Sequence, residues 1–259
     1  MEIKNIHDKK EIYRFLINDP ELHMYTLGDL DDFFWPKTIW FAICENNEIL
    51  SMALLYTGMV PATLILFQSG DVSKARELLT SIRPFLPSNL MVHLSPGLID
   101  LFKKENIVKD YGLHYRMVLK KVPIKPSDTN IRQLISQDKL KIDNLLSIAY
   151  PENWFDNRML ETGMYYGYFN NERLIGMAGV HVYSAAYKIA ALGNITTHPD
   201  FREKGIASKL TSAVCYELNK KTSVIGLNVT ATNVAAIKCY EKIGFVIYSS
   251  YDECVLANG

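Results

Sequence analysis

The sequence predicts a mixed α/β (α+β) fold in two tandem domains, each a twisted mixed sheet flanked by helices. The chain has 259 residues, of which 48% are hydrophobic, so it can form more than one buried core. Residues 122–129 (VPIKPSDT) combine two prolines with polar turn residues, and neither flank continues one periodicity through them. We therefore expect a domain at residues 1–121, a linker at 122–129 and a second domain at 130–259.

A strand–turn–strand pattern on each side of this linker indicates that one domain is duplicated. Both patterns contain Asn-Asn-Glu between extended apolar runs, at residues 46–48 and 170–172, and each predicts a β-hairpin. A second similar pair, residues 102–107 and 240–245, occurs in the same order. The separations are 124 and 138 residues, so the second copy holds extra chain between its hairpin and its last helix. Order and spacing favour duplication over chance similarity of short hairpins.

The second copy predicts the element order β-α-β-β-β-α-β-α-β. Apolar residues recur at steps of three and four from Ala207 to Leu218, as on an amphipathic helix. Asn233 is a suitable N-cap for the last helix, and Gly244 is a suitable end for it. Expected strands cover residues 131–135, 165–169, 174–183, 188–197 and 224–230 and a final pair within 245–256, and expected helices cover residues 139–149, 207–218 and 233–243.

The first copy predicts a similar but shorter set of elements. Residues 68–71 (QSGD) join a strand directly to a helix, so one short turn stands where the second copy has a longer loop. Expected strands cover residues 41–44, 49–56, 63–67, 90–94 and 114–120, and expected helices cover residues 72–82 and 98–105.

Composition and charge exclude several classes of protein. Lys+Arg and Asp+Glu both number 28, whereas a nucleic-acid-binding protein usually has a basic excess. No stretch approaches the roughly 20 apolar residues that span a bilayer, and the first thirty residues lack the apolar core of a signal peptide. The four cysteines have no CxxC spacing, which favours reduced packing residues over a cysteine nucleophile. We expect a soluble cytoplasmic protein with no nucleic-acid, membrane or metal partner.

The segment from Thr197 to Ala207 has the features of a phosphate-binding loop. A strand ends at Thr197, and residues 202–207 (REKGIA) open a helix. The first turn of a helix has unpaired amide donors and the positive end of the helix dipole. Gly205 permits close approach of a ligand to the backbone, and Arg202 and Lys204 add positive charge. Read alone, the same segment could be a surface loop that contains a glycine.

Two motifs together resemble the GNAT superfamily of N-acetyltransferases over the second half of the chain. Residues 202–207 match Gln/Arg-x-x-Gly-x-Gly/Ala between a strand and a helix. Residues 233–245 match Asn-x-x-Ala-x-x-x-Tyr-x-x-x-Gly-Phe at every fixed position. The tandem arrangement with a degenerate first copy resembles the FR47-like and glycine N-acyltransferase branch.

The resemblance implies acetyl-CoA as cosubstrate and assigns residues to it. The pantetheine arm would bind along the backbone of the strand that ends at Thr197, with a bulge near Gly193. The pyrophosphate would bind the loop amides, with Arg202 as support, and Asn233 either contacts the cofactor or caps a helix. The implied cofactor-binding residues are Ile195, Thr196, Thr197, Arg202, Glu203, Lys204, Gly205, Ile206, Ala207, Ser208 and Asn233.

Tyr240 is the candidate catalytic residue, because the family places this helix beside the thioester. A phenol can protonate the departing CoA thiolate, since the pKa of tyrosine lies above that of a thiol. The alternative is a tyrosine that only packs on the sheet. Phe102 stands at the equivalent point of the first copy, which also lacks the loop, so we expect the first copy neither to bind CoA nor to turn it over.

The sequence does not assign the general base or the acceptor. The strand at residues 188–197 has no carboxylate, which leaves Glu152, Asp156, Glu161 and His181 as equal candidates beside ordered water. Aromatic segments at residues 150–155 and 161–166 contain acids and favour a small-molecule amine or amino acid as the acceptor, with a peptide as the alternative. A non-catalytic acyl-CoA-binding module is the other alternative, and the protein could be a monomer or a homodimer.

Overall fold

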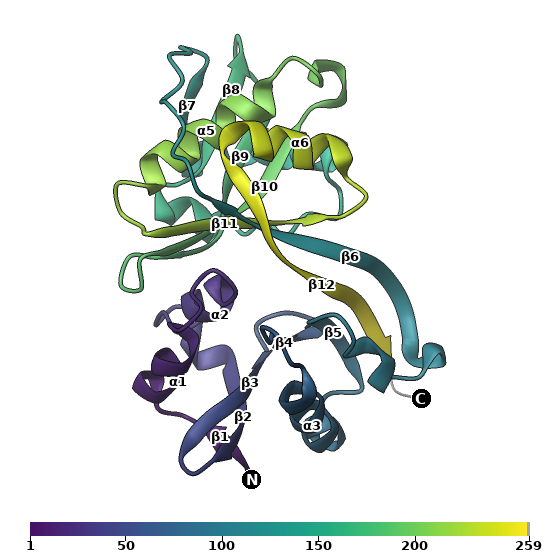
Figure 1. Ribbon diagram of the computed structural model, residues 1–259. Coiled ribbons are helices and arrows are strands. Elements are labelled where there is room, and N and C mark those ends of the chain that lie inside the picture. The colour runs from purple at the N-terminus through teal and green to yellow at the C-terminus, as the bar shows by residue number, and fades with distance from the viewer. Residues whose placement is uncertain (258–259) are drawn as a thin grey trace. The chain divides into compact units, whose positions relative to one another are not determined.

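The computed structural model describes residues 1–257, which form two compact units (Figure 1). The first unit comprises residues 1–116, 229–233 and the chain from 247 on, and the second comprises residues 117–228 and 234–246. The expected linker at residues 122–129 therefore lies within the second unit. The assignment of residues 1–121 and 130–259 as domains stays a prediction.

The first unit is a mixed sheet with helices. Its strands lie in the order β1-β2-β3-β4-β5, followed by the end of β12; β4 and β5 are parallel and the other pairs are antiparallel. The long strands β6 (Ile107–Leu119) and β12 (Phe245–Ala257) each contain residues of both units. The other elements are β1 (Glu2–Ile6), α1 (Lys9–Leu16), α2 (Met24–Gly28), β2 (Thr38–Glu45), β3 (Glu48–Tyr56), β4 (Ala62–Leu66), α3 (Ser73–Ile82) and β5 (Asn89–Leu94).

The second unit follows the predicted element order. Strands β7 to β10 pair in chain order and antiparallel, and β11 then pairs parallel to β10. Helices α5 and α6 lie on the same face of this sheet (Figure 1). The elements are β7 (Ile131–Gln133), α4 (Lys139–Ala149), β8 (Tyr166–Asn170), β9 (Arg173–Ser184), β10 (Ile189–Thr197), α5 (Ile206–Leu218), β11 (Val224–Thr230) and α6 (Val234–Ile243).

Both predicted hairpins are present. Asn46 and Asn47 form the loop between β2 and β3 with φ of 50° and 66°, the left-handed region that a type I′ turn requires. The loop between β8 and β9 consists of Asn171 and Glu172, since Asn170 already pairs with Arg173. The sequence similarity aligns residues 46–48 with residues 170–172. The two-residue loops therefore differ by one position in this alignment.

Two expectations about elements are wrong, and three elements were not expected. The expected helix at residues 98–105 is two short 3-10 turns, because Phe102 between them is extended and buried in the core. Phe102 is therefore not on a helix equivalent to that of Tyr240. The expected strand pair at the C-terminus is one continuous strand, β12, since its last part, from Asp252 to Ala257, pairs with β5 instead of folding back on its first part. The N-terminal elements β1, α1 and α2 were not expected.

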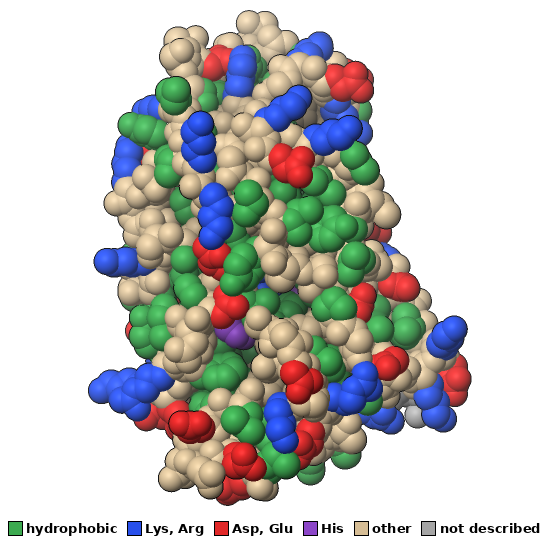
Figure 2. Space-filling view, in the orientation of Figure 1, with side chains coloured by type: hydrophobic (Ala, Val, Ile, Leu, Met, Phe, Trp, Pro, Cys, Tyr) green, Lys and Arg blue, Asp and Glu red, His purple; other side chains and the backbone are tan. Residues whose placement is uncertain are grey.

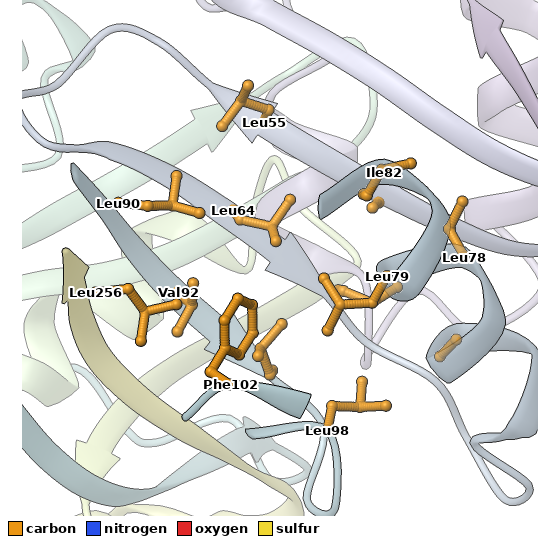
Figure 3. Packing of buried hydrophobic residues seen from close by; sticks show 14 of the residues in the cluster. Leu55, Leu64, Leu78, Leu79, Ile82, Leu90, Val92, Leu98, Phe102 and Leu256 are labelled. Atoms are coloured by element: carbon orange, nitrogen blue, oxygen red, sulfur yellow. The ribbon is translucent and has the colours of Figure 1, made fainter. Parts of the chain in front are cut away.

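A hydrophobic cluster holds α3 against the sheet of the first unit (Figure 3). Leu78, Leu79 and Ile82 of α3 are almost fully buried together with Leu64 and Val92 of the strands. Burial of this kind is the main favourable term in folding.

We expect Leu79→Ala to destabilise the protein by about 2–5 kcal/mol, because the loss of buried methyl groups leaves a cavity. Urea unfolding followed by circular dichroism measures the change. Leu140→Ala is the control, since Leu140 is 76% exposed, and it should change stability by no more than about 0.5 kcal/mol. Equal effects of the two substitutions would contradict the assignment of this core.

Charged side chains are mixed over the surface. On the face shown in Figure 2, Lys and Arg lie among Asp and Glu, and no continuous basic area is visible. Among residues 1–257, none of the helices is both long and apolar enough to cross a bilayer. The four cysteines are unpaired, and Cys44, Cys215 and Cys254 are buried.

Candidate active site

The loop between β10 and α5 is tied back to the end of β10. The Arg202 side chain donates from Nε to the carbonyl oxygen of Thr197 at 3.4 Å. The Lys204 ammonium donates to the carbonyl oxygen of Asp200 at 3.4 Å and lies 4.8 Å from the ring centre of Phe201. Two of the predicted basic residues therefore hold the loop in one conformation beside the start of α5.

The start of α5 leaves its amides open to a ligand. Gly205 is the N-cap with φ of 73°, a left-handed conformation that glycine adopts without strain, and it has no side chain to cap the first turn. Glu203 is also left-handed, with φ of 64°. Ile206 is buried and would contact any Cβ added at Gly176, so the first turn is anchored to the sheet on its inner side. Such a helix start attracts anions through its N–H groups and its dipole.

The strands β10 and β11 separate next to this loop. Their parallel pairing ends at Leu192 and Leu227, whereas β10 continues to Thr197. The bulge expected near Gly193 is present, since the register with β9 shifts between Gly193 and Thr196 and Asn194 has φ of 52°. The last five residues of β10 are therefore free of β11 along one edge.

The first unit has no such separation between its corresponding strands. β4 and β5 stay paired from Ala62 with Leu90 to Leu66 with Leu94, which is the full length of β4. A segment of six residues, 67–72, then leads to α3 at Ser73, so this connection is longer than the expected turn at residues 68–71.

Tyr240 lies on α6 and is buried at 8% exposure. Its ring contacts Phe245 edge-on, with the ring centres 6.0 Å apart. α6 packs against α5, so Tyr240 belongs to the same compact unit as the loop. Asn233 immediately precedes α6 and donates its backbone N–H to Thr230.

An aromatic group covers the bulge of β10. Tyr165 is fully buried, and its hydroxyl donates to the carbonyl oxygen of Val180 at 2.8 Å. The Asn194 amide donates to the Tyr165 hydroxyl at 3.0 Å and to the carbonyl oxygen of Trp154 at 3.3 Å. Phe155 packs edge-on against Tyr165, with ring centres 5.6 Å apart. Burial raises the pKa of Tyr165, so its phenol stays neutral.

The four candidate bases have different surroundings in the structure. Glu152, Asp156 and Glu161 are exposed, and the Asp156 side chain caps a 3-10 turn by accepting from the N–H of Arg158. His181 instead lies beside the bulge of β10, with the Trp154 ring centre 5.6 Å away. Burial lowers the pKa of His181, and the nearby Asn194 amide partly opposes this. Residues 1–257 contain no group of three or more His, Cys, Asp or Glu that could hold a metal ion.

The sequence did not show that Gly179 and Gly193 face this group. They pair across β9 and β10, and a Cβ at Gly179 would lie 2.2 Å from the Tyr165 ring. The sequence shows only that each of the two expected strands contains a glycine. Whether these glycines pair depends on the strand register, which the sequence does not give.

The loop, the separated strands and the helix that carries Tyr240 lie within one segment, residues 130–245. Residues 130–245 match the family described as Acetyltransferase (GNAT) family. No curated protein matches the chain by sequence.

Solved structures extend the likeness in fold to the whole chain. A Drosophila protein superposes with a TM-score of 0.72 at 13% identity, covering 98% of each chain. A GCN5-related N-acetyltransferase from Sphaerobacter thermophilus gives 0.64 at 11% identity, covering 99% of this chain and 95% of its own. A tandem GNAT protein of the clavulanic acid biosynthesis pathway gives 0.55 at 12% identity, covering 100% and 98%. The fold is therefore GNAT-like over its full length.

Proposed function

We propose that this protein is an acyl-CoA-dependent N-acyltransferase that moves an acetyl group from acetyl-CoA to a primary amine. The observation that carries the proposal is the uncapped start of α5 next to the separated strands β10 and β11. The first provides amides for a pyrophosphate, and the second provides an unpaired strand edge for a pantetheine arm. The match of residues 130–245 to the GNAT family supports the same conclusion.

The residues present fit this cosubstrate. The amides of residues 204–208 would bind the pyrophosphate, and Arg202 would keep the loop in place through Thr197. The backbone of Ile195, Thr196 and Thr197 would bind the pantetheine. In the first unit, the corresponding strands β4 and β5 stay paired and leave no free strand edge. We therefore also propose that residues 1–121 form a degenerate domain that does not bind CoA.

Direct attack in a ternary complex is the mechanism that we propose. The neutral amine attacks the thioester carbon, a C–N bond forms, and the C–S bond breaks. The Tyr240 phenol gives its proton to the departing thiolate, which yields free CoA thiol. The proton lost by the amine must pass to a base.

The acceptor would bind at the aromatic group over the bulge of β10. Trp154 is 37% exposed there, and the exposed acids Glu152, Asp156 and Glu161 favour a cationic small molecule. A structure described as a glucosamine N-acetyltransferase region of a fungal β-N-acetylglucosaminidase has the same fold, with a TM-score of 0.55 at 10% identity, covering 98% of this chain and 38% of its own. A peptide N-terminus or lysine is the alternative acceptor. The free thiols suit a cytoplasmic protein, as a monomer or a homodimer.

An acceptor panel with acetyl-CoA tests the function. The panel contains glucosamine, spermidine, tyramine, glycine, lysine and a short peptide with a free N-terminus, and release of CoA thiol is followed with a chromogenic disulfide. We expect turnover of at least one small amine at a rate above that of the peptide. Faster turnover of the peptide would favour the alternative acceptor.

A non-catalytic acyl-CoA-binding module is the second candidate, because β10 carries no carboxylate. It predicts that acetyl-CoA binds in a calorimetric titration, but that no amine or peptide releases CoA thiol. That result would reject the enzyme.

A further inference from the structure

The imidazole of His181 lies flat against the backbone of β10. A Cβ built at Gly193 would lie 2.1 Å from Cδ2 of His181 and 2.3 Å from its Nε2, so only glycine permits this contact. β9 also has one extra residue here, since Ala191 pairs with Val182 and Leu192 with Val180. His181 is that extra residue. Two bulges on paired strands, one at His181 and one at Asn194, therefore direct both side chains away from the regular sheet pattern.

Two buried polar atoms at this point have no hydrogen-bond partner within residues 1–257. They are Nε2 of His181 and the side-chain oxygen Oδ1 of Asn194. The amide nitrogen of Asn194 is already used, because it donates to the Tyr165 hydroxyl and to the carbonyl oxygen of Trp154. Buried polar groups in proteins are nearly always paired. In the tautomer that carries its proton on Nδ1, Nε2 of His181 is an acceptor. Together with Oδ1 of Asn194 it then matches a ligand that brings N–H donors, such as an amine.

This group lies on the face of the sheet opposite α5. A Cβ at Gly176 of β9 would meet Ile206 and Leu210 of α5, whereas one at Gly179, three residues along, would meet Tyr165. Side chains three residues apart in a strand point to opposite faces. Gly179 pairs with Gly193, so His181 is on the Tyr165 face. An amine bound there would approach a thioester held on the α5 side through the separated strands β10 and β11.

We propose that His181 is the general base of the reaction and that Asn194 positions the acceptor amine. This inference rests on the proposed function. As the amine nitrogen forms its bond to the thioester carbon, its proton passes to Nε2 of His181, and a second N–H donates to Oδ1 of Asn194. The C–S bond breaks and the thiolate takes the Tyr240 proton. His181 is then protonated and Tyr240 deprotonated, and proton exchange with solvent restores both.

The surroundings of His181 keep it uncharged at neutral pH. Burial lowers its pKa, and the nearby Asn194 amide only partly opposes this. The neighbouring groups are the Trp154 indole, the Tyr165 phenol before β8 and Asn194 on β10. Tyr165 is itself neutral, because burial raises its pKa. A neutral imidazole can accept a proton. The acidic limb of the pH profile of kcat should therefore lie below the ordinary histidine pKa of about 6.5.

His181→Gln tests the base directly. With tyramine, or whichever amine of the panel is turned over fastest, we expect kcat to fall about 10²-fold while the Kd of acetyl-CoA stays within twofold. The wild-type kcat should rise with pH on the acidic side and then level off, and His181→Gln should lack this limb. Tyr183→Phe, two residues along the same strand, is the control and should keep the wild-type kcat.

Gly193→Ala tests the position of the ring without changing the histidine. The added methyl group displaces the imidazole, so we expect kcat to fall at least tenfold in the wild type, but less than twofold in a His181→Ala background. A wild-type rate and pH profile in His181→Gln would overturn this inference alone. Absence of turnover by the wild-type protein over the whole panel would instead reject the proposed function, and with it this inference.

Discussion

Tyr240→Phe is expected to lower kcat for acetyl transfer about 10³-fold and to leave the Kd of acetyl-CoA within twofold. The substitution removes only the hydroxyl, so the proton donor for the CoA thiolate is lost while the ring keeps its edge-on contact with Phe245. Positioned acid catalysis contributes roughly 10²–10⁴-fold, and the thiolate of CoA then has to leave unprotonated. Steady-state kinetics and a calorimetric titration with acetyl-CoA measure the two quantities.

Tyr216→Phe is the matched control, because Tyr216 lies on α5 in the same compact unit and has no role in the proposed reaction. It should leave kcat within twofold. An equal loss in both variants would point to a packing effect. A loss of acetyl-CoA affinity in Tyr240→Phe without a loss of kcat would show that the phenol binds the cosubstrate and does not protonate it.

Gly205→Val is expected to weaken acetyl-CoA binding about 10³-fold. Gly205 has φ of 73°, and a β-branched residue can adopt this conformation only at a cost, so the loop would shift and the amides of α5 would lose their alignment. Two charge-assisted hydrogen bonds at roughly 2 kcal/mol each correspond to about three decades in Kd. Calorimetric titration with acetyl-CoA and with CoA measures the effect.

Gly70→Val is a close control, because Gly70 in the short turn of the first unit has φ of 70°. Neither glycine has an atom within 4 Å of an added Cβ, so both substitutions impose the same backbone strain. We expect a similar small drop in Tm for both variants and an unchanged acetyl-CoA affinity for Gly70→Val. If Gly70→Val lost affinity equally, the first unit would have a part in CoA binding, and its assignment as a degenerate domain would be wrong.

Elements with strong local signals were predicted well. The helix expected at residues 139–149 is α4, and the strand expected at 224–230 is β11, each with the same bounds. Asn46 and Asn47 form the predicted hairpin turn, because asparagine tolerates the left-handed conformation that such a turn requires. The loop before α5 was also predicted. Gly205 is the N-cap of this helix, and each of the two motifs lies within a few residues of the turn or helix that it predicts.

Elements without such signals were missed or assigned wrongly. Residues 98–105 have a helical pattern, but burial of Phe102 in the core keeps the chain extended there. Strand β1 has mixed charges and pairs antiparallel with β2. In both cases contacts with distant residues outweigh the local preference.

The sequence by itself predicted the GNAT-like class, a phosphate-binding loop at residues 202–207 and Tyr240 as the candidate acid. Each depends on residues that are near one another along the chain, where turn geometry and helix starts are set locally. Only the tertiary structure separates His181 from Glu152, Asp156 and Glu161, and the proposal of His181 as the base depends on it. His181 meets Gly193 and Asn194 only because β9 and β10 pair in one register with a bulge in each, and strand register is a property of the folded sheet.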